Sequence, residues 1–402
     1  MSSASPTLSA PRTITPYAPW PAFAADEVEA VNRVLASGRV NYWTGQEART
    51  FEREHAAAAG CEYAVAVCNG TSALELAIQA LGIPPGAEIV TSPRTFIASA
   101  SCAVMRGCVP VLADVDRDSQ NLTADTIERV LSPRTRAIVA VHLAGWPCAM
   151  DPILALAEYH GLQVIEDCAQ ASGASYRGRP VGSLGHLAAF SFCQDKILST
   201  GGEGGMLTTC ARHLWERAWS FKDHGKNWAA AHQPDPPPGF RWLHDAFGTN
   251  WRMTELQAAI GRVQLRKLPE WTRIRRANRL RLDQVCRRYP CVRVPEPPAE
   301  IGHAGYKAYV FVEPGGLRSG WSRDRILAEL TALGVPCFSG SCSELYLEKS
   351  FRASGLGPPA PLPVARELGE TSLMFLVHPT LTATNLEETL EALAAVLARA
   401  SR

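Results

Sequence analysis

The sequence lacks the features that mark membrane, secreted and nucleic-acid-binding proteins. No apolar run approaches the length that a bilayer-spanning helix needs. Residues 1–20 are polar and proline-rich, without the charged start and apolar core of a signal peptide. Basic and acidic residues nearly balance, and the formal net charge of +1 argues against nucleic acid or an anionic membrane as the main partner. We therefore expect a cytoplasmic protein that binds neither.

The cysteines lack the paired spacing of a metal site or a disulfide framework. All twelve are scattered singly, and none forms a C-x-x-C pair. Several, such as Cys68, Cys168 and Cys193, lie inside apolar runs. Buried, reduced thiols are the simplest interpretation, and no metal ion is expected.

Two nucleotide-binding signatures are also missing. The chain has no G-x-G-x-x-G turn, which positions a dinucleotide, and no Walker loop, which ends in Gly-Lys-Ser or Gly-Lys-Thr. A nicotinamide-dependent dehydrogenase on a parallel sheet is therefore disfavoured.

The first two thirds of the chain do contain short apolar runs that alternate with longer helical patterns. The runs are continuous, as expected for strands that are buried on both faces. Strands are predicted at residues 63–68, 87–91, 109–115, 137–145, 163–170, 186–193 and 205–209. The predicted fold class is α/β, with a mostly parallel seven-stranded sheet flanked by helices.

The last third predicts a smaller α+β domain. Residues 229–249 are rich in proline and predict a long loop, which often binds ligands. A long helical region follows from about residue 252, and then strands at 306–312 and 371–379 with helices at 323–334 and 386–400. We expect an N-terminal extension (1–25), a large α/β domain (26–265) and a small C-terminal α+β domain (266–402).

The first segment that could form part of a binding or catalytic site is CNGTSALELAIQALG. A strand ends at Cys68, a turn follows at Asn69-Gly70, and Thr71 or Ser72 is expected to cap an amphipathic helix. Such a helix N-terminus offers free N–H groups and a partial positive charge, which suit a phosphate. The alternative is that the segment merely starts a helix.

The second segment, VIEDCAQASGA, ends a buried strand with Glu166 and Asp167. Open α/β sheets bind ligands at the carboxyl ends of their strands. A buried carboxylate there needs a cation or several donors, and a protonated ring nitrogen is a suitable cation. The alternative is that Asp167 caps a helix.

The third segment, FSFCQDKILSTGGEGG, places Lys196 three residues after an apolar run. A lysine at a low-dielectric sheet edge can form a Schiff base with an aldehyde, and the glycines let the backbone approach a cofactor. A surface lysine or a phosphate ligand are the alternatives. Together, the three segments supply the phosphate site, acidic partner and lysine that pyridoxal 5'-phosphate (PLP) requires.

The sequence resembles the DegT/StrS sugar aminotransferases, PLP enzymes of the aspartate aminotransferase fold class (the PLP-transferase type I fold). The resemblance runs from residues 37–56 to residues 376–390. Its motifs are NGTSAL, TFIASA, DVDRDSQNLT, HLAGWPCAMD, VIEDCAQASGA, FSFCQDKILSTGGEGGMLTT and FGTNWRMTELQAAIG. Together these motifs are very specific, although no single one would be.

The resemblance implies a role for each matching residue. It implies that Lys196 is the Schiff-base lysine and that Asp167 pairs with the pyridinium nitrogen. It also implies that Gln170 donates near the phenolic oxygen and that Phe96 lies against the cofactor ring. The implied phosphate ligands are Gly70, Thr71 and Ser191, and Asn250 is implied to reach the phosphate in a neighbouring subunit. A homodimer with shared active sites follows. Phe96 as plain core, and Ser191 as a partner of a nearby carbonyl, are the alternatives.

The implied reaction moves an amino group from an amino acid, L-glutamate by resemblance, to a keto-sugar that is nucleotide-linked, with pyridoxamine 5'-phosphate as the intermediate form. The product would serve lipopolysaccharide or other glycan synthesis, or secondary metabolism. A PLP-dependent sugar dehydratase, an aminocyclitol aminotransferase and a non-catalytic PLP-binding regulator are the alternatives. The first commonly lacks the lysine or recruits an iron–sulfur cluster, and the last would need a DNA-binding segment that the sequence does not show.

Some residues depart from the family pattern and leave the substrate open. Cys193, Gln194 and Asp195 before the lysine have no assigned role. Arg94 is expected either to bind an anionic substrate group or to lie exposed. Trp43 and Thr44 join Arg94 as candidate substrate residues.

Overall fold

The computed structural model describes residues 13–236 and 238–402. The predicted N-terminal extension, residues 1–25, therefore lies partly outside the described residues. Its described part, up to residue 24, contains no helix or strand and runs along the C-terminal helix α13 (Ala383–Ala400), where Asn385 donates to the carbonyls of Thr15 and Pro16.

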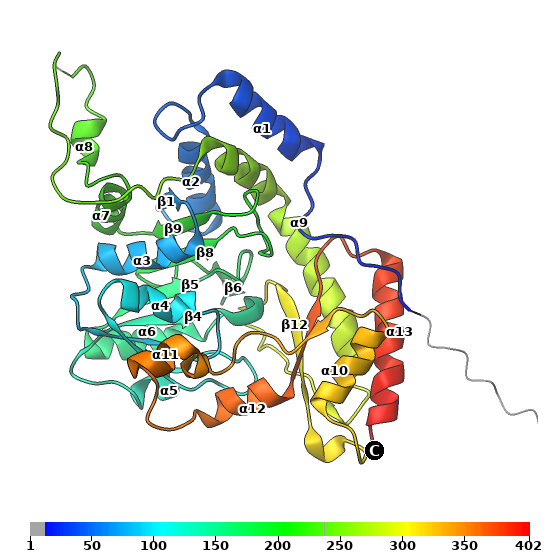
Figure 1. Ribbon diagram of the computed structural model, residues 1–402. Coiled ribbons are helices and arrows are strands. Elements are labelled where there is room, and N and C mark those ends of the chain that lie inside the picture. The colour runs from blue at the N-terminus through cyan, green and yellow to red at the C-terminus, as the bar shows by residue number, and fades with distance from the viewer. Residues whose placement is uncertain (1–12, 237) are drawn as a thin grey trace, which may run out of the picture.

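A seven-stranded sheet forms the centre of the molecule (Figure 1). Its strand order is β1-β9-β8-β5-β4-β2-β3. In chain order the strands are β1 (Tyr63–Val67), β2 (Glu88–Thr91), β3 (Val109–Leu112), β4 (Thr135–Val141), β5 (Gln163–Asp167), β8 (Leu187–Ser191) and β9 (Gly205–Thr209). β9 alone runs in the opposite direction to the other six strands of this sheet. The predicted mostly parallel sheet is confirmed.

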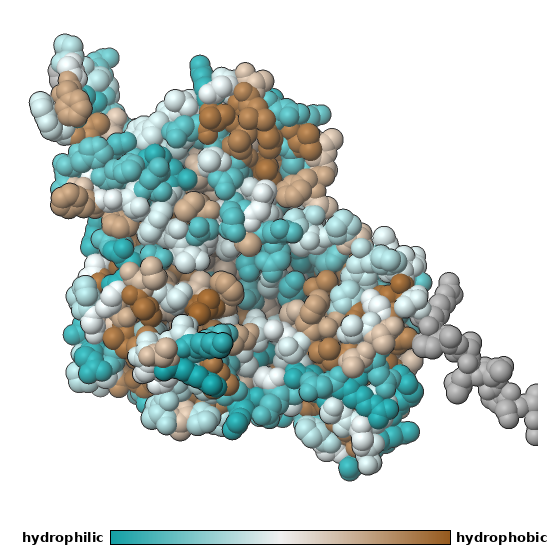
Figure 2. Space-filling model, viewed as in Figure 1, coloured by the Kyte–Doolittle hydropathy of each residue, from teal (hydrophilic) through white to brown (hydrophobic). Residues whose placement is uncertain are grey.

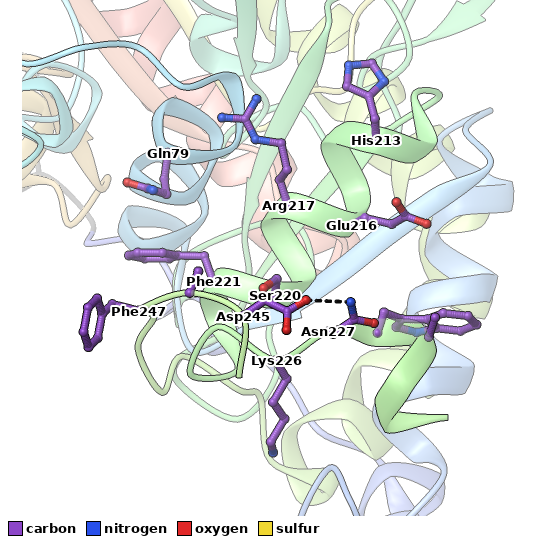
Figure 3. Close-up of a pocket in the computed structure, with 13 residues that line it drawn as sticks. Gln79, His213, Glu216, Arg217, Ser220, Phe221, Lys226, Asn227, Asp245 and Phe247 are labelled. Atoms are coloured by element: carbon purple, nitrogen blue, oxygen red, sulfur yellow. Dashed lines mark hydrogen bonds between the residues drawn. The ribbon is translucent and has the colours of Figure 1, made fainter. Parts of the chain in front are cut away.

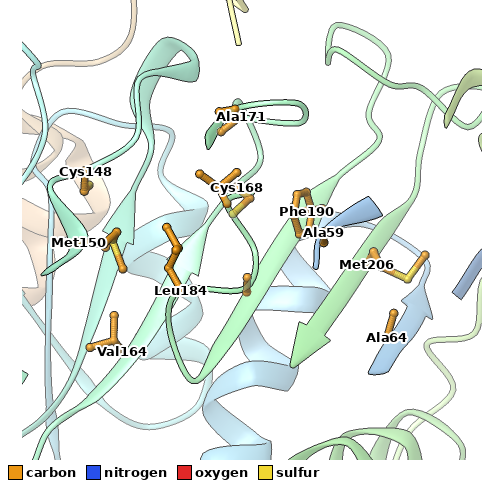
Figure 4. Close-up of a cluster of buried hydrophobic side chains, with 14 of the residues drawn as sticks. Ala59, Ala64, Cys148, Met150, Val164, Cys168, Ala171, Leu184, Phe190 and Met206 are labelled. Carbon is orange, nitrogen blue, oxygen red and sulfur yellow. The ribbon is translucent and has the colours of Figure 1, made fainter. Parts of the chain in front are cut away.

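Helices cover both faces of this sheet, which explains the continuous apolar runs. Along β4, Ala137, Val139 and Val141 face one core while Ile138 and Ala140 face the other. The first core is closed by α3 (Gly70–Leu81), α4 (Ala98–Met105) and α7 (Arg212–Lys222). The second, part of which Figure 4 shows, is closed by α2 (Glu47–Ala58), α5 (Ala124–Glu128) and α6 (Met150–His160).

The helical region predicted from residue 252 forms one long helix, α9 (Glu255–Cys286). Thr254 caps it, and the Gln257 side chain returns to the Thr254 backbone in a capping box. The helix packs on α1 (Ala25–Ser37) and α2, and further along on β12 (Lys307–Val312) and α13. The predicted domain boundary at residues 265 and 266 lies inside α9, and the division into domains stays a prediction.

A second, four-stranded antiparallel sheet follows, with the order β10-β12-β14-β13. Its strands are β10 (Val292–Arg293), β12 (Lys307–Val312), β13 (Cys337–Phe338) and β14 (Ser372–Leu376). One core joins this sheet to α10 (Arg323–Ala332), α13 and the end of α9. The strands and helices predicted for this part of the chain are confirmed, although their ends differ by a few residues from the predicted bounds.

Smaller elements complete the described chain. β6 (Ser175–Tyr176), β7 (Arg179–Pro180) and β11 (Ile301–Gly302) form a three-stranded sheet. Three short 3-10 helices span Leu143–Gly145, Pro314–Gly316 and Leu345–Leu347, and two further helices are α11 (Lys349–Ser354) and α12 (Pro363–Thr371). Among the described residues, no helix has the length and apolarity to cross a membrane.

The predicted loop at 229–249 projects from the molecule beyond α7 (Figure 1). It begins in the short helix α8 (Trp228–Ala231) and otherwise contains no helix or strand in the part that is described. Phe240, Trp242 and Phe247 on this loop are strongly exposed. Apolar surface also gathers over α1 (Figure 2), where Val28 and Leu35 are exposed.

Candidate active site

A cavity of about 710 Å³ opens where α3 begins and where β5 and β8 end. Its lining includes most of the predicted site residues: Gly70, Thr71, Phe96, Asp167, Gln170, Ser191 and Lys196. These residues come from four separate stretches of the chain. The fold brings them together because parallel strands present their carboxyl ends at the same edge of the sheet.

The N-terminus of α3 differs from the prediction in its cap. The N-cap is Asn69, whose side chain accepts a 2.8 Å hydrogen bond from the Ser72 N–H, so neither Thr71 nor Ser72 caps the helix. Asn69 has the extended backbone that an N-cap requires, and Asn is among the best capping residues. The N–H groups of Gly70 and Thr71, in the first helical turn, have no carbonyl partner within the helix.

Gly70 creates the close approach between α3 and β8. A Cβ atom at this position would lie 2.6 Å from Cβ of Ser191. Only glycine therefore allows the Ser191 hydroxyl to lie beside the free N–H groups of the helix. A helix N-terminus, a hydroxyl and a gap that a methyl group would fill are a suitable cradle for a phosphate.

Asp167 is held in one orientation at the end of β5. It is buried, with 4% of its surface exposed. The Ser99 hydroxyl donates to its Oδ2 at 2.7 Å, and the Ala169 N–H donates to its Oδ1 at 3.1 Å. The segment after Asp167 forms turns rather than a helix, so the helix-cap alternative is wrong.

Glu166 lies on the other side of β5 and has a structural role. It accepts hydrogen bonds from His142 at 3.0 Å and from the N–H groups of Gly182, Leu184 and Gly185. Burial raises the pKa of Glu166, but these donors more than offset the effect, so its pKa lies below the ordinary value. The side chains of Glu166, His142 and Cys168 lie close enough together to ligate one metal ion. The four hydrogen bonds of Glu166, however, already use both of its oxygens.

Lys196 lies in the turn after β8, and its side chain is only 17% exposed. The surface-lysine alternative is therefore wrong. Its Nζ lies 3.4 Å from Oδ1 of Asp195, and its carbonyl accepts a 2.9 Å hydrogen bond from the Trp20 indole. The lysine thus faces the same cavity as Asp167, from the neighbouring strand.

Phe96, Gln170 and Cys193 also line the cavity. Phe96 is 66% exposed, so it is not plain core. Gln170 lines the cavity, and its side-chain oxygen accepts from the Ala144 N–H at 2.8 Å. Cys68 and Cys193 are only half-buried, and Cys193 lines the cavity, so the expectation of a buried thiol is corrected for both. Cys168 is fully buried as expected.

Arg94 contradicts both alternatives predicted for it. It is completely buried rather than exposed, and it does not line the cavity. Its guanidinium donates to Gln120 at 2.8 Å, to Ser343 at 2.7 Å and to Ser372 at 3.2 Å. These partners occupy the donors that an anionic substrate would need, so Arg94 ties the loop after β2 to the second sheet instead.

Trp43, Thr44 and Asn250 lie outside this cavity. Trp43 stacks on His232 with ring centroids 5.8 Å apart, and Thr44 is exposed. Asn250 is also exposed, and its backbone forms a single antiparallel β-bridge with that of Asp223. The chain therefore does not bring these three residues to its own cavity.

A second cavity, of about 520 Å³, lies between α3, α7 and the projecting loop (Figure 3). Gln79 and Arg217 line it, and Asn227 donates to Asp245 across the loop at 2.7 Å. The two cavities share no lining residue. None of the residues predicted singly for the site lines this cavity, but Asp245 and Phe247 belong to loop 229–249, for which ligand binding is predicted.

Sequence reasoning missed residues that hold the predicted site residues in place: Ser99, which itself lines the cavity, Tyr306 and Trp20. Ser99 could have been found, because Thr95 and Ser99 are polar at helical spacing in an apolar segment, and their hydroxyls lie 2.9 Å apart. Tyr306, which donates to Asp195, and Trp20 carry no such signal. Both are distant in sequence from the lysine that they support.

The architecture and the site define a class. A mostly parallel seven-stranded sheet with a phosphate cradle, a strand-end carboxylate and a strand-end lysine is the arrangement of the PLP-dependent transferases of the aspartate aminotransferase fold. Residues 21–394 match the model of the DegT/DnrJ/EryC1/StrS aminotransferase family. The chain belongs to this family.

Similar proteins agree with this assignment. The chain is 40% identical over 250 residues to the spore coat polysaccharide biosynthesis protein SpsC of Bacillus subtilis, a match that covers 62% of the chain and 64% of SpsC, less than two thirds of each. It is 36% identical over 354 residues to the GDP-perosamine synthase of Caulobacter vibrioides, covering 86% of the chain and 89% of that protein. The solved structure of an aminotransferase from Psychrobacter cryohalolentis has a TM-score of 0.93 and 55% identity, covering 95% of the chain and 99% of that structure.

Proposed function

We propose that this chain transfers the amino group of L-glutamate to the ketone of a nucleotide-linked sugar, with PLP as cofactor. The observation that carries the proposal is that Lys196, Asp167 and the N-terminus of α3 line one cavity. The names of similar proteins support the substrate class, since a GDP-perosamine synthase and a polysaccharide biosynthesis protein are among them. The product would be an amino-sugar for glycan or secondary-metabolite synthesis.

The residues of the cavity fit the cofactor. The N–H groups of Gly70 and Thr71 and the hydroxyl of Ser191 would bind its phosphate, and Lys196 would hold its aldehyde carbon as the Schiff-base lysine. When bound, PLP supplies an electron sink for the carbanion that forms at the substrate carbon. Asp167 would keep a proton on the ring nitrogen, which strengthens that sink.

The remaining cavity residues orient rather than react. Phe96 would lie against the cofactor ring, and the Gln170 amide would donate to its phenolic oxygen. Lys196 would carry the proton between the substrate carbon and the cofactor carbon that it leaves, since it is the base nearest to the reacting atoms. Its placement within the cavity, rather than on the surface, supports this assignment.

We also propose a homodimer with shared active sites. Asn250, Trp43 and Thr44 lie outside the cavity of their own chain, and Asn250 and Thr44 are exposed. The projecting loop and α1 both expose apolar side chains, as an interface between copies would. In the dimer, Asn250 would reach the phosphate site of the second copy, and Trp43 and Thr44 would contact its sugar substrate. Sedimentation of the purified protein would test this, and a monomer would contradict it.

The amino-transfer proposal is tested by a half-reaction. The cofactor-loaded protein should absorb in the visible range, and L-glutamate should convert that band to the band of pyridoxamine 5'-phosphate. Lys196→Ala should show neither the resting band nor the conversion, whereas Lys349→Ala, at an exposed position, should behave as the unchanged protein. An unchanged band in Lys196→Ala would contradict the proposal.

The acceptor is identified in the second half-reaction. The pyridoxamine form is offered nucleotide-linked keto-sugars, free keto-sugars and keto-cyclitols in parallel, and return of the visible band reports transfer. We expect return with a nucleotide-linked keto-sugar. Return with a keto-cyclitol alone would favour an aminocyclitol aminotransferase instead.

A further inference from the structure

The carboxylate of Asp195 lies beside the ammonium of Lys196 and is fixed from another part of the fold. Oδ1 of Asp195 is 3.4 Å from Nζ of Lys196. The Tyr306 hydroxyl donates to Oδ2 of the same carboxylate. Tyr306 directly precedes β12 and is only 5% exposed, so its hydroxyl is a rigid anchor for a carboxylate that is itself more than half exposed.

The same tyrosine contacts the lysine. Nζ of Lys196 lies 5.4 Å from the centroid of the Tyr306 ring. The backbone of Lys196 has a separate anchor, because Trp20 donates to its carbonyl and packs edge-on against Trp271 of α9, with ring centroids 5.1 Å apart. The lysine is therefore held at its backbone and at its charged end, each time by residues distant in sequence.

We propose that Asp195 is a positioning residue for Lys196: the Tyr306 hydroxyl fixes the Asp195 carboxylate, and the carboxylate holds the positively charged nitrogen of Lys196 at the mouth of the cavity. This rests on the proposed function, in which Lys196 alternates between binding the cofactor and moving a proton. A free lysine side chain has several rotatable bonds, and a fixed opposite charge limits them. The arrangement would keep the nitrogen within reach of the reacting carbon after the substrate amine has displaced it.

Other charged groups surround the pair. Lys307 of β12 and Arg275 of α9 lie on the Tyr306 side. The other titratable groups that line the cavity are Glu75, Asp167, Cys193 and Glu203. Burial lowers the pKa of Lys307 to about 8. These groups are present in every variant proposed below, so differences between variants report on the Asp195 carboxylate.

The charge state of Asp195 suits the role. Burial raises the pKa of the Asp195 carboxyl, but the charge of Lys196 and the hydrogen bond from Tyr306 more than offset this and bring it below the ordinary value. Asp195 is therefore ionised at neutral pH. An ionised carboxylate 3.4 Å from the Lys196 nitrogen is the negative partner that the positioning role requires.

The first test is a pH titration of the visible band of the cofactor-loaded protein, without substrate. Asp195→Asn keeps the shape and removes the charge, so we expect the midpoint to fall by about half a unit to one unit, since solvent screens part of the interaction. Tyr306→Phe should shift it in the same direction by less. Gln194→Ala, a change to the exposed neighbour in the same turn, should leave it in place. An Asp195→Asn midpoint equal to that of the unchanged protein would overturn the proposal.

The second test needs no cofactor. Acetylation of Lys196 by acetic anhydride, followed by peptide mass spectrometry, measures how readily its nitrogen reacts at fixed pH. In Asp195→Asn we expect labelling about threefold to tenfold faster, because the nitrogen is no longer held against the carboxylate and its side chain regains freedom to meet the reagent. Equal rates would overturn the proposal. If the unchanged protein gave no visible band with PLP, the proposed function would fail, and this labelling would still decide the role of Asp195.

Discussion

Ser99 donates a 2.7 Å hydrogen bond to Oδ2 of Asp167, and it does so from helix α4 rather than from the strand that carries Asp167. The Ser99 hydroxyl also lies 2.9 Å from that of Thr95. Thr95 directly precedes Phe96, which is exposed in the cavity. One short chain of hydrogen bonds thus links the residue assigned to the cofactor's ring nitrogen with the segment assigned to the ring face.

Removal of this hydrogen bond should weaken cofactor binding without unfolding the protein. We expect Ser99→Ala to raise the dissociation constant for PLP about tenfold, since a hydrogen bond to a charged group contributes on the order of 1.5 kcal/mol. Titration of the visible band measures it. Ser101→Ala, on the same helix but outside the cavity, is the matched control and should bind as before. Equal affinity in both variants would show that Ser99 does not support Asp167.

The phosphate cradle predicts a steric effect at Gly70. In Gly70→Ala the added methyl group would lie 2.6 Å from Cβ of Ser191, so the helix and the strand must separate. We expect PLP affinity to fall by about tenfold or more, since overpacking of this kind costs about 1–3 kcal/mol. Gly315→Ala, where an added Cβ meets nothing within 4 Å, should have no such effect. Retained affinity for PLP in Gly70→Ala would place the phosphate elsewhere.

Replacement of the buried Arg94 should reduce the stability of the protein rather than its substrate binding. Arg94→Lys keeps the charge buried, but one ammonium cannot reach three acceptors on separate elements. We expect the free energy of unfolding to fall by about 2 kcal/mol, measured by urea denaturation. Arg129→Lys, at an exposed position, is the control. A change in the KM for the sugar substrate with unchanged stability would restore the substrate role.

His55 predicts a pH dependence of stability. It is buried among Phe51, Phe190 and Phe192, and burial lowers its pKa from 6.5 to about 4. The unfolded chain therefore binds a proton between pH 6.5 and 4 that the folded chain does not, so stability is lost as the pH falls through this range. Relative to pH 7.5, the loss from this group is about 2 kcal/mol at pH 5.

His55→Leu isolates this contribution, because other groups titrate equally in both proteins. We expect the unchanged protein to lose about 2 kcal/mol more than the variant between pH 7.5 and pH 5, measured by urea unfolding at each pH. His160→Leu, at an exposed position, should follow the unchanged protein. If His55→Leu and the unchanged protein lost the same free energy, the buried imidazole would not be the cause.

The sequence predicts the main sheet well because its strands are buried on both faces and stand out as apolar runs. The lysine and the carboxylate follow from their positions at strand ends, and their meeting in one cavity follows from the parallel topology. These features depend on local pattern and on one general rule about sheets. The resemblance to a known family then gives the roles.

Contacts between segments distant in sequence could not be predicted. Arg94 is buried by Ser343 and Ser372, which lie in the last sixty residues of the chain, and no local pattern indicates such a partner. The same holds for Tyr306 and Asp195. The cap of α3 is a different failure, because Asn69, Thr71 and Ser72 are all good capping residues and only the backbone geometry selects among them.

The assignment of Lys196 as the cofactor-binding lysine is the central claim, and covalent trapping tests it most directly. The protein is incubated with PLP, reduced with borohydride and digested, and the modified peptide is identified by mass spectrometry. We predict that the pyridoxyl group is found on Lys196, and that Lys196→Ala carries none. A label on another lysine, such as the completely buried Lys222, or equal labelling of Lys196→Ala, would contradict the account.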